Sequence, residues 1–485
     1  MSQSEYLQEQ ILNRLRMDNP WWTSNSIDEY FNEMQRRLYL DLFYPLVADT
    51  ELRRGLLLMG PRRVGKTVML YHTIQKLIDN GIDSQKIIYI SIETPIYNRI
   101  SLEELFALAR QAVGKTDNLR GFFVFYDEIQ YLKDWEIHLK SVIDTFHYSK
   151  FIASGSAAAA LKMKSQESGA GRFTDFNLPP LTFNEYIHLK RLNGLMIPST
   201  INWLGEDKES FDTINIRTLN EHFIQYINFG GYPEVVFSEK IQANPGQFIR
   251  SDIVDKVLLR DLPGLYGITD VQELNSLFTV IAYHSGSEFS YDNLSKMSGV
   301  KKDTLRKYIE YLQAAFLIRI VHKTDINAKK FQRATAFKIY LTNPSLRSAL
   351  FQPILPTDEK MGDMVETTII AQWIQRENAH ISYANWKDGR KDGEVDIVGL
   401  SPINQKPLWA VEVKWSDRYF EHIGELQSLL NFMENNRIGQ AIVTSIEKSG
   451  KKQLDKMALQ FIPTAVYAYI VGHNTLQEQR QKTGM

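Results

Sequence analysis

Residues 60–67, GPRRVGKT, combine glycines, a lysine and a hydroxyl at a spacing that suits the phosphates of a nucleotide. The segment follows the apolar run LLLM and opens a helical pattern, VMLYHTIQKLI, so backbone N–H groups and a helix start converge there. Lys66 would contact the β- and γ-phosphates of ATP, and the Thr67 hydroxyl would bind Mg²⁺. The predicted ATP-binding residues are Gly60, Pro61, Arg62, Arg63, Val64, Gly65, Lys66, Thr67 and Val68.

A second run, FFVFYDEIQ, leads from apolar residues into two adjacent carboxylates. The run predicts a buried strand that brings Asp127 to the Mg²⁺ through water, with Glu128 as the general base that polarises the attacking water. The next apolar run ends near Ser154, whose hydroxyl would sense the γ-phosphate. An acidic turn after an ordinary strand is the alternative interpretation of Asp127 and Glu128.

A second group of carboxylates lies near the carboxy-terminal end. Residues 391–400, KDGEVDIVGL, and 408–416, LWAVEVKWS, predict two strands of a hairpin. Glu412 and Lys414 are two residues apart, so they project to the same side, where Asp396 from the partner strand can meet them. Asp396 and Glu412 would hold Mg²⁺ or Mn²⁺ through oxygen, and the metal would activate water for attack on a phosphodiester.

Two further residues complete this candidate site. Glu366 lies on the predicted amphipathic helix at 362–374, and Lys414 would orient or polarise the substrate. Charged residues are costly in a core strand, so their place in WAVEVKW favours a site. An ion pair at a sheet edge, or a nuclease fold that has lost its activity and serves for docking, are the alternatives.

Residues 290–321 show helix–turn–helix spacing of apolar residues, with Gly299 at the turn. The apolar positions are Leu294, Met297, Val300, Leu305, Ile309 and Leu312. Basic residues decorate the second helix and the wing that would follow it, which suits contact with DNA phosphates. The predicted nucleic-acid residues are Lys301, Lys302, Arg306, Lys307, Lys329 and Lys330, with Lys323, Arg333 and Lys338 also on the wing. A winged helix that serves only as a protein spacer is the alternative.

Alternating elements must position the first group of residues. From residue 55 to about 180, apolar runs of strand length alternate with helical patterns, which predicts a parallel sheet covered on both faces. Residues 185–270 look mostly helical, and residues 271–350 show three helical patterns followed by two strand-like runs. Residues 360–470 follow the order helix, strand, strand, helix, strand, after an expected linker at 351–361. The expected fold class is therefore α/β.

The composition excludes several kinds of chemistry. The chain has 485 residues, 56 Lys and Arg against 57 Asp and Glu, and a formal net charge of -1, which excludes a polycation that coats nucleic acid. Cysteine is absent, which excludes disulfides, thiolate zinc sites, iron–sulfur clusters and cysteine nucleophiles. The amino-terminal residues lack a signal-peptide pattern, and no apolar run approaches the ~20 residues of a membrane span. We therefore expect a cytoplasmic protein with no membrane partner.

The order of motifs resembles the core of the AAA+ ATPases: a phosphate loop, a DE strand, a small-hydroxyl strand, then GR and a proline-ended strand. The resemblance implies ATP and Mg²⁺ as cofactors, ATP hydrolysis and a small helical lid. In that superfamily the arginine after the small-hydroxyl strand often acts on the nucleotide of a neighbouring subunit. This role falls on Arg172 and implies a homo-oligomer. From the residues alone, a surface arginine in a loop is the simpler interpretation.

The chain also resembles a group of bacterial and archaeal proteins that join such an ATPase to a carboxy-terminal domain formerly of unknown function. The motifs GPRRVGKT, DEIQ, SGS, GR, PLTFNEY, GGYPE and RDL carry this resemblance. Asp396 followed by Glu412 and Lys414, with Glu366 on the preceding helix, resembles the PD-(D/E)XK nucleases, although valine replaces the nominal proline. The resemblance implies a restriction-endonuclease-like domain with metal-dependent endonuclease activity.

The leading hypothesis is an ATP-hydrolysing protein that holds DNA with its winged helix and cuts it with its nuclease-like end. Such a fusion suits defence against foreign DNA. One alternative is a non-cutting ATP-driven switch or scaffold whose nuclease-like domain docks DNA or a partner protein, and another is a nucleotide sensor without turnover. The expected domains are an N-terminal helical segment (1–50), an AAA+ P-loop ATPase core (51–185), a helical lid (186–270), a winged helix (271–350) and a PD-(D/E)XK nuclease-like domain (362–470).

Overall fold

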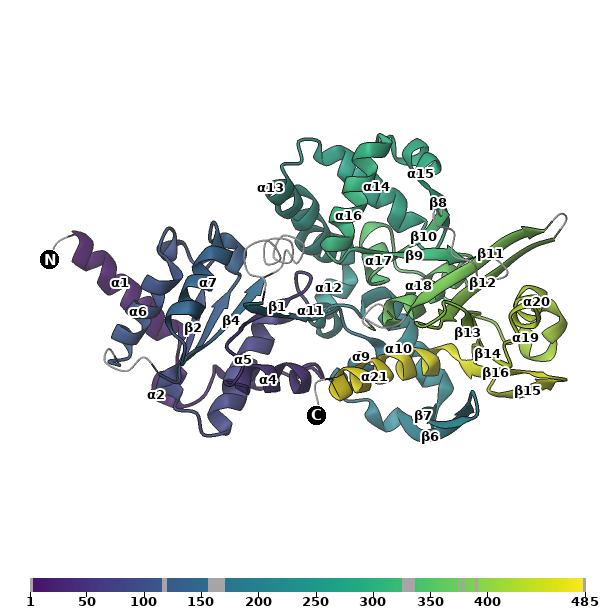
Figure 1. Cartoon of the computed structure of the whole chain (residues 1–485), viewed down its shortest axis with the longest axis horizontal. Coiled ribbons are helices and arrows are strands. Elements are labelled where there is room, and N and C mark those ends of the chain that lie inside the picture. The colour runs from purple at the N-terminus through teal and green to yellow at the C-terminus, as the bar shows by residue number, and fades with distance from the viewer. Residues whose placement is uncertain are drawn as a thin grey trace. The chain divides into compact units, whose positions relative to one another are not determined.

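The chain divides into two compact units, Met1–Pro179 and Pro180–Met485 (Figure 1). The computed structural model describes residues 3–115, 120–155, 171–324, 336–373, 376, 380–388 and 391–482. No helix of the described residues combines the length and apolar character that crossing a bilayer requires. The α/β class that the sequence predicts is confirmed in both units.

The first unit is built on a sheet of five parallel strands, as the alternation of apolar runs and helices predicts. Its strands are β1 (Gly55–Met59), β2 (Ile87–Ser91), β3 (Phe123–Asp127), β4 (Lys150–Gly155) and β5 (Phe173–Asn177). The order is β2-β3-β4-β1-β5, so β1, which leads into the phosphate loop, lies between β4 and β5. Every residue of β1, β3 and β4 is buried, which is typical of a parallel sheet with both faces covered.

The helical segment at the amino terminus is part of this unit. The helices are α1 (Gln3–Asp18), α2 (Trp21–Ser24), α3 (Glu29–Asn32), α4 (Leu40–Ala48), α5 (Lys66–Asp79), α6 (Leu102–Ala112) and α7 (Trp135–Thr145), with 3-10 turns η1 (Ser84–Lys86), η2 (Pro95–Tyr97) and η3 (Ile129–Tyr131). The indole N–H groups of Trp21 and Trp22 both donate to the carbonyl oxygen of Ile87, at 2.9 and 2.8 Å. The Asn19 side chain bonds both the N–H and the carbonyl oxygen of Tyr89. These contacts satisfy the open edge of β2, which would otherwise be free to pair with another chain.

The second unit contains a mixed sheet of nine strands in the order β15-β16-β14-β13-β12-β11-β9-β10-β8. Its strands are β8 (Glu288–Ser290), β9 (Ile318–Thr324), β10 (Ala336–Leu341), β11 (Ile381–Asp388), β12 (Lys391–Leu400), β13 (Pro407–Glu412), β14 (Gln440–Ser445), β15 (Gly450–Leu454) and β16 (Met457–Pro463). A separate hairpin consists of β6 (Met196–Trp203) and β7 (Glu206–Thr213). The expectation that residues 185–270 are mostly helical is wrong for this hairpin.

The helices of the second unit surround these strands. They are α9 (Phe183–Leu189), α10 (Ile216–Phe229), α11 (Pro233–Phe237), α12 (Glu239–Ala243), α13 (Leu262–Tyr266), α14 (Val271–Tyr283), α15 (Tyr291–Ser298), α16 (Lys302–Ala314), α17 (Ser345–Leu350), α18 (Met361–Trp373), α19 (Arg418–Glu421), α20 (Gln427–Asn436) and α21 (Thr464–Lys482). Short turns of 3-10 helix, η4 (Asn193–Leu195) and η7 (Ile423–Glu425), and two π-helical stretches, η5 (Gly246–Asp255) and η6 (Val257–Asp261), complete the set.

Residues 271–350, which we call the basic segment, contain the expected three helices, α14, α15 and α16. The two strands β9 and β10 follow them, and the short β8 lies between α14 and α15. Gly299 ends α15 in the left-handed region, with φ of 77°, where a glycine is unstrained. The predicted apolar positions are buried with one exception. Met297 is 39% exposed, so its assignment to the core is wrong.

One sheet unites the basic segment with the carboxy-terminal strands. Strand β9 pairs in parallel with β11, and among the described residues Lys323 pairs with Tyr383 and Thr324 with Ala384. Strands β11, β12 and β13 then continue as the antiparallel arrangement that the sequence predicts for Asp396 and its neighbours. The sequence gives no sign of the pairing between β9 and β11, because the two strands lie far apart in the chain.

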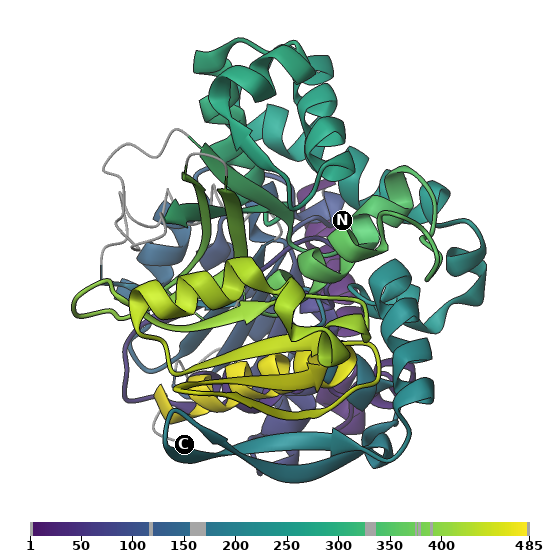
Figure 2. The same cartoon turned by 90° about the vertical axis from the view of Figure 1, so that its right-hand side faces the viewer.

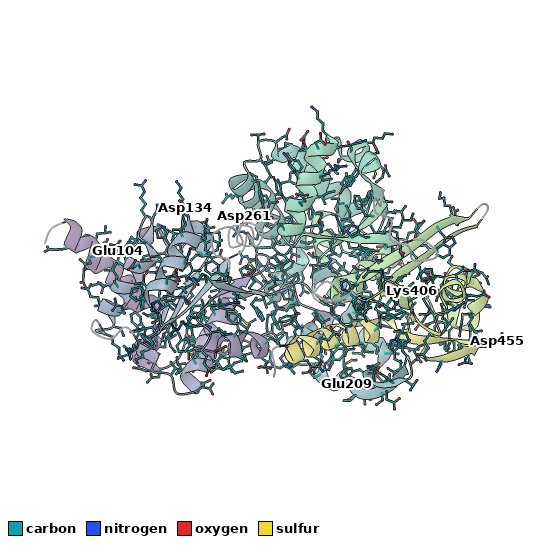
Figure 3. All side chains as sticks on the ribbon, in the orientation of Figure 1. Glu104, Asp134, Glu209, Asp261, Lys406 and Asp455 are labelled. Carbon is teal, nitrogen blue, oxygen red and sulfur yellow. The ribbon has the colours of Figure 1, made fainter. Side chains whose placement is uncertain are left out.

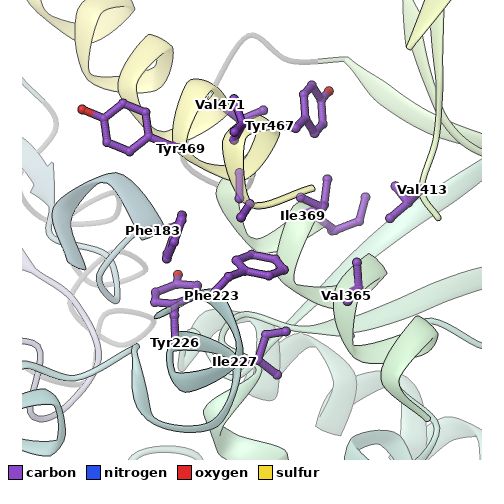
Figure 4. Close-up of a cluster of buried hydrophobic side chains, with 14 of the residues drawn as sticks. Phe183, Phe223, Tyr226, Ile227, Val365, Ile369, Val413, Tyr467, Tyr469 and Val471 are labelled. Carbon is purple, nitrogen blue, oxygen red and sulfur yellow. The ribbon is translucent and has the colours of Figure 1, made fainter. Parts of the chain in front are cut away.

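Two apolar clusters lie on the two faces of this sheet. The larger includes α18, α21, Ile397 and Val411 (Figure 4), and the smaller includes α20, Val398 and Ala410. Neighbouring residues of one strand therefore enter different clusters, as alternation requires. Figure 2 shows α20 and α21 against these strands. Ten of the 13 residues of α18 are buried, so the expectation of an amphipathic helix is wrong there.

Asn228 of α10 holds the segment that the sequence predicts to be a linker. Its amide donates to the carbonyl oxygen of Ile354 at 2.9 Å, and its oxygen accepts from the N–H of Ile354 at 2.7 Å and from the Ser348 hydroxyl at 2.9 Å. Ile354 is itself buried in the larger cluster. The segment is thus fixed on the unit's core by a polar side chain rather than left in solvent.

Replacement of Asn228 by Ala should lower the free energy of unfolding of the Pro180–Met485 unit by about 2–3 kcal/mol, because two buried backbone groups lose their partner. Denaturant unfolding followed by tryptophan fluorescence measures the change. Asn244→Ala, at an exposed asparagine, is the matched control and should change stability little. Equal stability of the two variants would contradict the role given to Asn228.

Candidate functional site

The phosphate loop lies between β1 and α5, as its sequence predicts. Gly65 has φ of 91° and precedes the first turn of α5, so this position favours glycine. A Cβ at Gly60 would lie 2.2 Å from the carbonyl oxygen of Leu178, so only glycine fits there. The Lys66 ammonium group donates to the carbonyl oxygens of Gly60 and Pro61 at 3.1 and 2.8 Å, which holds it inside the loop.

Asp127 is the centre of a hydrogen-bond network at the end of β3. The Thr67 hydroxyl donates to Oδ2 at 2.7 Å and the Tyr89 hydroxyl to the same oxygen at 2.8 Å, while the Ser154 hydroxyl donates to Oδ1. Asp127 is 2% exposed. The structure therefore brings together three residues that the sequence predicts for one site, Thr67, Asp127 and Ser154, and adds Tyr89.

Glu128 follows Asp127 in an unusual conformation. Its φ is 53°, a left-handed value that is uncommon for a residue other than glycine and that occurs at functional sites. Its N–H donates to Asp127 Oδ1 at 3.1 Å and contacts the Ser154 hydroxyl at 3.3 Å, and the Gln130 amide donates to its carboxylate. These contacts fix the Glu128 backbone against Asp127 and hold its carboxylate beside Gln130. A carboxylate in this place can accept a proton from water.

Arg37 supports the phosphate loop, and sequence analysis missed it. One of its terminal nitrogens donates to the carbonyl oxygens of Val64 at 2.8 Å and Pro179 at 2.9 Å. The residue is 7% exposed, and its guanidinium carbon lies 5.5 Å from the centre of the Tyr39 ring. No motif marks this arginine, because its role depends on contacts 27 and 142 residues away in the chain.

Arg172 lies at the amino end of β5, whereas the phosphate loop follows the carboxyl end of β1. It directly precedes β5, and its carbonyl oxygen accepts from the N–H of Gly55, the first residue of β1. The phosphate loop follows the other end of β1, one strand of five residues or roughly 15 Å away. Arg172 forms an ion pair with Asp144 at 2.9 Å, with both side chains about half exposed. Its place therefore does not serve the phosphate loop of its own chain.

The second site lies on β12 and β13, where the sequence places it. The Lys414 ammonium group donates to Glu412 Oε1 at 2.7 Å and lies 3.7 Å from Asp396 Oδ2. Asp396 Oδ2 also accepts from the N–H of Val413 at 2.7 Å. The hydroxyl of Thr444 bonds both the N–H and the carbonyl oxygen of Lys414, so the backbone at this position is fixed.

Glu366 joins this group through residues of the basic segment. The Lys338 ammonium group donates to Glu366 Oε1 at 2.9 Å and also pairs with Glu394 Oε1 at 2.5 Å. The Tyr340 hydroxyl donates to the same oxygen of Glu366 at 2.5 Å. Lys338 is 3% exposed, so its predicted place on an exposed wing is wrong. Both Lys338 and Tyr340 belong to β10, two residues apart on one face.

Glu394 is a further residue that sequence analysis missed. It stands two positions before Asp396 in β12, and this i, i+2 spacing is the signal that would have found it. Its other carboxylate oxygen accepts from the Asn385 amide at 3.0 Å. With Glu366, Asp396 and Glu412 it makes four carboxyl groups around two lysines, Lys338 and Lys414, so acidic groups outnumber basic groups by two. We call these six residues the carboxylate–lysine cluster.

Burial strongly affects ionisation in this cluster. Burial, reinforced by Asp396 and opposed by Lys414, raises the pKa of Glu412 to about 8. Burial also raises the pKa of Glu366 to about 7, with Lys338 opposing it and Asp396 adding to it. Although burial lowers it, the surrounding carboxylates hold the pKa of each lysine above the ordinary range. The lysines therefore stay charged, while the raised pKa values of Glu412 and Glu366 favour a proton on these carboxyl groups near neutral pH.

A divalent cation fits the cluster's charge and oxygen donors. Glu412 Oε2 is buried and has no hydrogen-bond partner among the described residues, and if all four carboxyl groups were ionised, their excess of two negative charges would match one such ion. However, no three His, Asp or Glu side chains stand together as a ready metal-binding group within the ranges that the structure describes. In this arrangement the two lysines take the place of the cation.

The predicted nucleic-acid residues of α16 are exposed. Lys301, Lys302, Arg306 and Lys307 all reach solvent. Lys302 pairs with Asp292, and the Arg306 guanidinium carbon lies 5.0 Å from the centre of the Tyr291 ring, so neither extends freely. The predicted wing residues Lys329, Lys330 and Arg333 lie outside the described residues. Lys323 forms an ion pair with Glu288 at 3.3 Å instead of an open contact surface.

Comparison with protein families places a known domain on the first unit. Residues 52–187 match the family described as "AAA domain", which with the Walker-type phosphate loop implies binding of ATP and Mg²⁺. Residues 220–357 match the family described as a domain of unknown function, DUF8612. This match covers the basic segment and the helices before it. It does not reach the carboxylates of β12 and β13.

Two similar proteins are described as uncharacterized. An uncharacterized protein of Haemophilus influenzae is 25% identical over 293 residues, which cover 59% of this chain and 67% of that protein. Uncharacterized protein MJ1544 of Methanocaldococcus jannaschii is 24% identical over 349 residues, 70% of each chain. A solved Walker-type ATPase of Pyrococcus abyssi aligns with a TM-score of 0.40 and 14% identity over 65% of this chain and 97% of that one. The assignment of the first unit rests on the AAA-domain match.

Arg37→Met should weaken ATP binding by about tenfold, or about 1.4 kcal/mol, because the loop loses the side chain that fixes Val64. Fluorescent ATP-analogue titration measures the affinity. Arg36→Met removes the neighbouring exposed arginine, whose nearest contact with Asp79 is 3.9 Å, and should leave the affinity unchanged. A wild-type affinity in Arg37→Met would show that the loop keeps its shape without this arginine.

Proposed function

We propose that the AAA domain hydrolyses ATP, with Glu128 as the general base. The observation that carries the proposal is the network on Asp127, which joins a phosphate-loop hydroxyl, Thr67, to the end of the acidic strand. The Thr67 hydroxyl and the Asp127 carboxylate form an oxygen donor set that fits Mg²⁺, which supplies charge neutralisation when bound. Lys66 binds the phosphates, and Ser154 positions Asp127 and contacts the N–H of Glu128.

Arg172 would act on the nucleotide of a neighbouring subunit. It lies at the sheet edge away from its own phosphate loop, so an effect on ATP requires a second copy of the chain. Its exposure and its pairing with an exposed Asp144 leave the guanidinium accessible to such a partner. A homo-oligomer follows from this proposal.

The basic segment would bind DNA as a winged helix. The order α14, β8, α15, α16, β9, β10, with β10 between β9 and β8, supports this fold. Exposed Lys301, Lys307 and their neighbours on α16 would contact phosphates. The observation in favour is their position: Lys301, which directly precedes α16, and the three predicted residues of α16 are exposed, while the apolar positions of the same helix are buried.

The carboxylate–lysine cluster would be the active centre of a metal-dependent nuclease. Asp396 and Glu412 would hold Mg²⁺ or Mn²⁺, which activates water and stabilises charge on a phosphodiester when bound. Lys414, fixed by Thr444, would orient the phosphate, and Glu366 would support the site from α18. Together with an ATPase, such a centre would suit cleavage of foreign DNA, an interpretation that rests on the combination of modules alone.

A non-cutting role has a specific observation in its favour. Both lysines already neutralise part of the cluster, and Lys338 in particular occupies two carboxylates with 3% of its side chain exposed. A cluster of this kind can serve as a structural bridge between β10 and β12. In that case the protein is an ATP-driven switch whose second unit docks DNA or a partner protein.

Glu128→Gln should bind ATP but hydrolyse it at least about 100-fold more slowly, because the amide cannot accept the proton of water. Phosphate release measures hydrolysis, and retained nucleotide is quantified after gel filtration. Glu104→Gln, at an exposed glutamate of α6 (Figure 3), is the control and should hydrolyse ATP normally. Hydrolysis by Glu128→Gln at the wild-type rate would show that another group is the base.

Lys414→Ala should abolish cleavage of DNA and spare ATP hydrolysis. Linear, circular and single-stranded DNA and RNA are incubated with Mg²⁺ or Mn²⁺, with and without ATP. Lys406→Ala, at an exposed lysine before β13, is the matched control and should cut normally. If the wild-type protein leaves every substrate intact, the nuclease proposal fails and the non-cutting role remains.

Lys338→Met should raise the affinity for Mn²⁺ by at least about tenfold, because a competing positive charge leaves the cluster. Isothermal titration calorimetry measures the affinity, with or without any nuclease activity. Lys323→Met on β9 removes a lysine that pairs with Glu288 outside the cluster, and it is the control. Equal Mn²⁺ affinity in wild type and Lys338→Met would show that the lysine and the metal do not compete.

A further inference from the structure

A cavity of about 790 Å³ lies within the second unit, apart from the carboxylate–lysine cluster. Its floor is the sheet face formed by β12, β13, β14 and β16, and its walls are α21, the end of α18 and the β6–β7 hairpin. Cavities of roughly 300–1,000 Å³ hold small organic ligands. Trp409 lines this cavity and Glu412 stands three residues further along β13, so the two side chains face opposite sides of the sheet.

Indole rings dominate the apolar surface of the cavity. Trp373 and Trp409 are stacked, with ring centres 5.3 Å apart and planes at 25°. Gly399 pairs directly with Trp409 across the strands, and a Cβ at Gly399 would lie 2.0 Å from the indole. Glycine therefore lets the Trp409 ring lie flat on the neighbouring strand. A third indole, Trp203, enters from β6.

The hairpin is held in place over the cavity by contacts at both ends. The N–H of Leu204, in its turn, donates to Gln440 Oε1 of β14 at 2.6 Å. On β7, the Phe211 ring packs 5.0 Å from the Tyr469 ring of α21, and Glu209 lies 3.7 Å from His473. Figures 1 and 2 show the hairpin alongside α21. The cavity is thus bounded by an anchored wall rather than by a free strand.

The charged groups around the cavity are already paired. Arg376 donates to Glu478 Oε2 at 2.7 Å, and its guanidinium carbon lies 4.8 Å from the centre of the Trp373 ring. Lys208 pairs with Glu206. With its cations compensated in this way, the cavity is poorly suited to a phosphate cluster. It suits a ligand portion that is planar and uncharged.

Amide side chains supply the polar edge of the cavity. Asn474, Gln477 and Gln481 of α21 all line it, at i, i+3 and i+7, which places them on one face of the helix. Amides can donate and accept at the same time, so they pair with the edge of a nucleobase, and indoles stack on its face. The Gln477 amide nitrogen lies 3.3 Å from His473 Nε2. An apolar peptide side chain would offer no hydrogen bond to any of these amides.

We propose that this cavity binds a nucleobase, on a free nucleoside or nucleotide or on an unpaired strand of nucleic acid. The base stacks on the indole of Trp203 and bonds the amides of α21, since Gly399 and Trp373 cover the two faces of the Trp409 ring. This site is separate from the phosphate loop, which lies in the other unit and binds phosphates rather than a base. The proposal needs neither ATP hydrolysis nor DNA cleavage.

The test uses the full-length protein with its phosphate loop occupied by Mg²⁺ and a non-hydrolysable ATP analogue. The probes are adenosine, guanosine, cytidine, uridine and a single-stranded DNA of ten nucleotides, titrated by calorimetry. Ile201→Trp fills the cavity from β6, whereas Thr200→Trp, its exposed neighbour, places the same ring on the outer face. Gln477→Ala removes one amide without adding bulk.

We expect at least one probe to bind wild type and Thr200→Trp equally, and to bind Ile201→Trp and Gln477→Ala at least about tenfold more weakly. Binding of a nucleoside identifies a small molecule as the source, and binding of the oligonucleotide alone identifies an unpaired strand. The proposal is overturned if no probe binds, or if all four proteins bind equally. Should Ile201→Trp fail to fold, the affinity of Gln477→Ala decides alone.

Discussion

A charge inside a protein must be neutralised by a neighbour, and this constraint organises the second unit. Lys338 is almost fully buried, and it is stable there because Glu366 and Glu394 lie at hydrogen-bond distance. The three residues come from β10, α18 and β12, so a single ammonium group joins the basic segment to the carboxy-terminal strands. Strand β9 also pairs with β11 through Lys323 and Thr324. The charge cluster therefore adds side-chain contacts to a backbone connection between these parts of the sheet.

The same constraint explains why the cluster is a candidate site. Four carboxylates surround two lysines, and burial raises the pKa of Glu412 and Glu366 well above the ordinary range. A cluster with a purely structural role would be expected to have equal numbers of acidic and basic groups. This one keeps two extra carboxylates and an unpartnered buried oxygen on Glu412, a condition that a divalent cation relieves. Removal of either lysine should therefore raise the affinity of the cluster for a metal ion and weaken the structural bridge.

The sequence predicts most of the first site because its chemistry is local. Residues 60–67 and the pair Asp127 and Glu128 each lie within one short motif, and the parallel sheet brings the motifs to the same edge. Arg37 and Tyr89 escape prediction because an arginine or tyrosine in a helical or apolar run has many ordinary uses. Their roles arise only when the chain folds and a distant carbonyl or carboxylate comes within reach.

In the second unit, the pattern of Asp396, Glu412 and Lys414 predicts their meeting, because alternation in a strand fixes the face of each side chain. The prediction for Lys338 is wrong because the sequence does not show which side chains its strand meets. A lysine next to other lysines looks like part of an exposed basic surface, and only the partner strand shows that carboxylates bury it. The predictions that Met297 is buried and that α18 is amphipathic are wrong, because helical periodicity does not reveal which neighbours pack against a helix. The nine-stranded sheet could not be foreseen, because the sequence pattern does not show that β9 pairs with β11, a strand far along the chain.

The two aspartates, Asp127 and Asp396, show how surroundings decide what a carboxylate can do. Hydroxyls of Thr67, Tyr89 and Ser154 contact Asp127, and a hydroxyl can keep its place when a cation arrives, because its oxygen also has lone pairs. Asp396 instead faces the Lys414 ammonium group, which has no lone pair and repels a cation. The first site can therefore receive Mg²⁺ by rotation of hydroxyls. The second can receive it only when its lysines yield or share their carboxylates, so its metal affinity would depend on the positions of Lys338 on β10 and of Lys414 after β13.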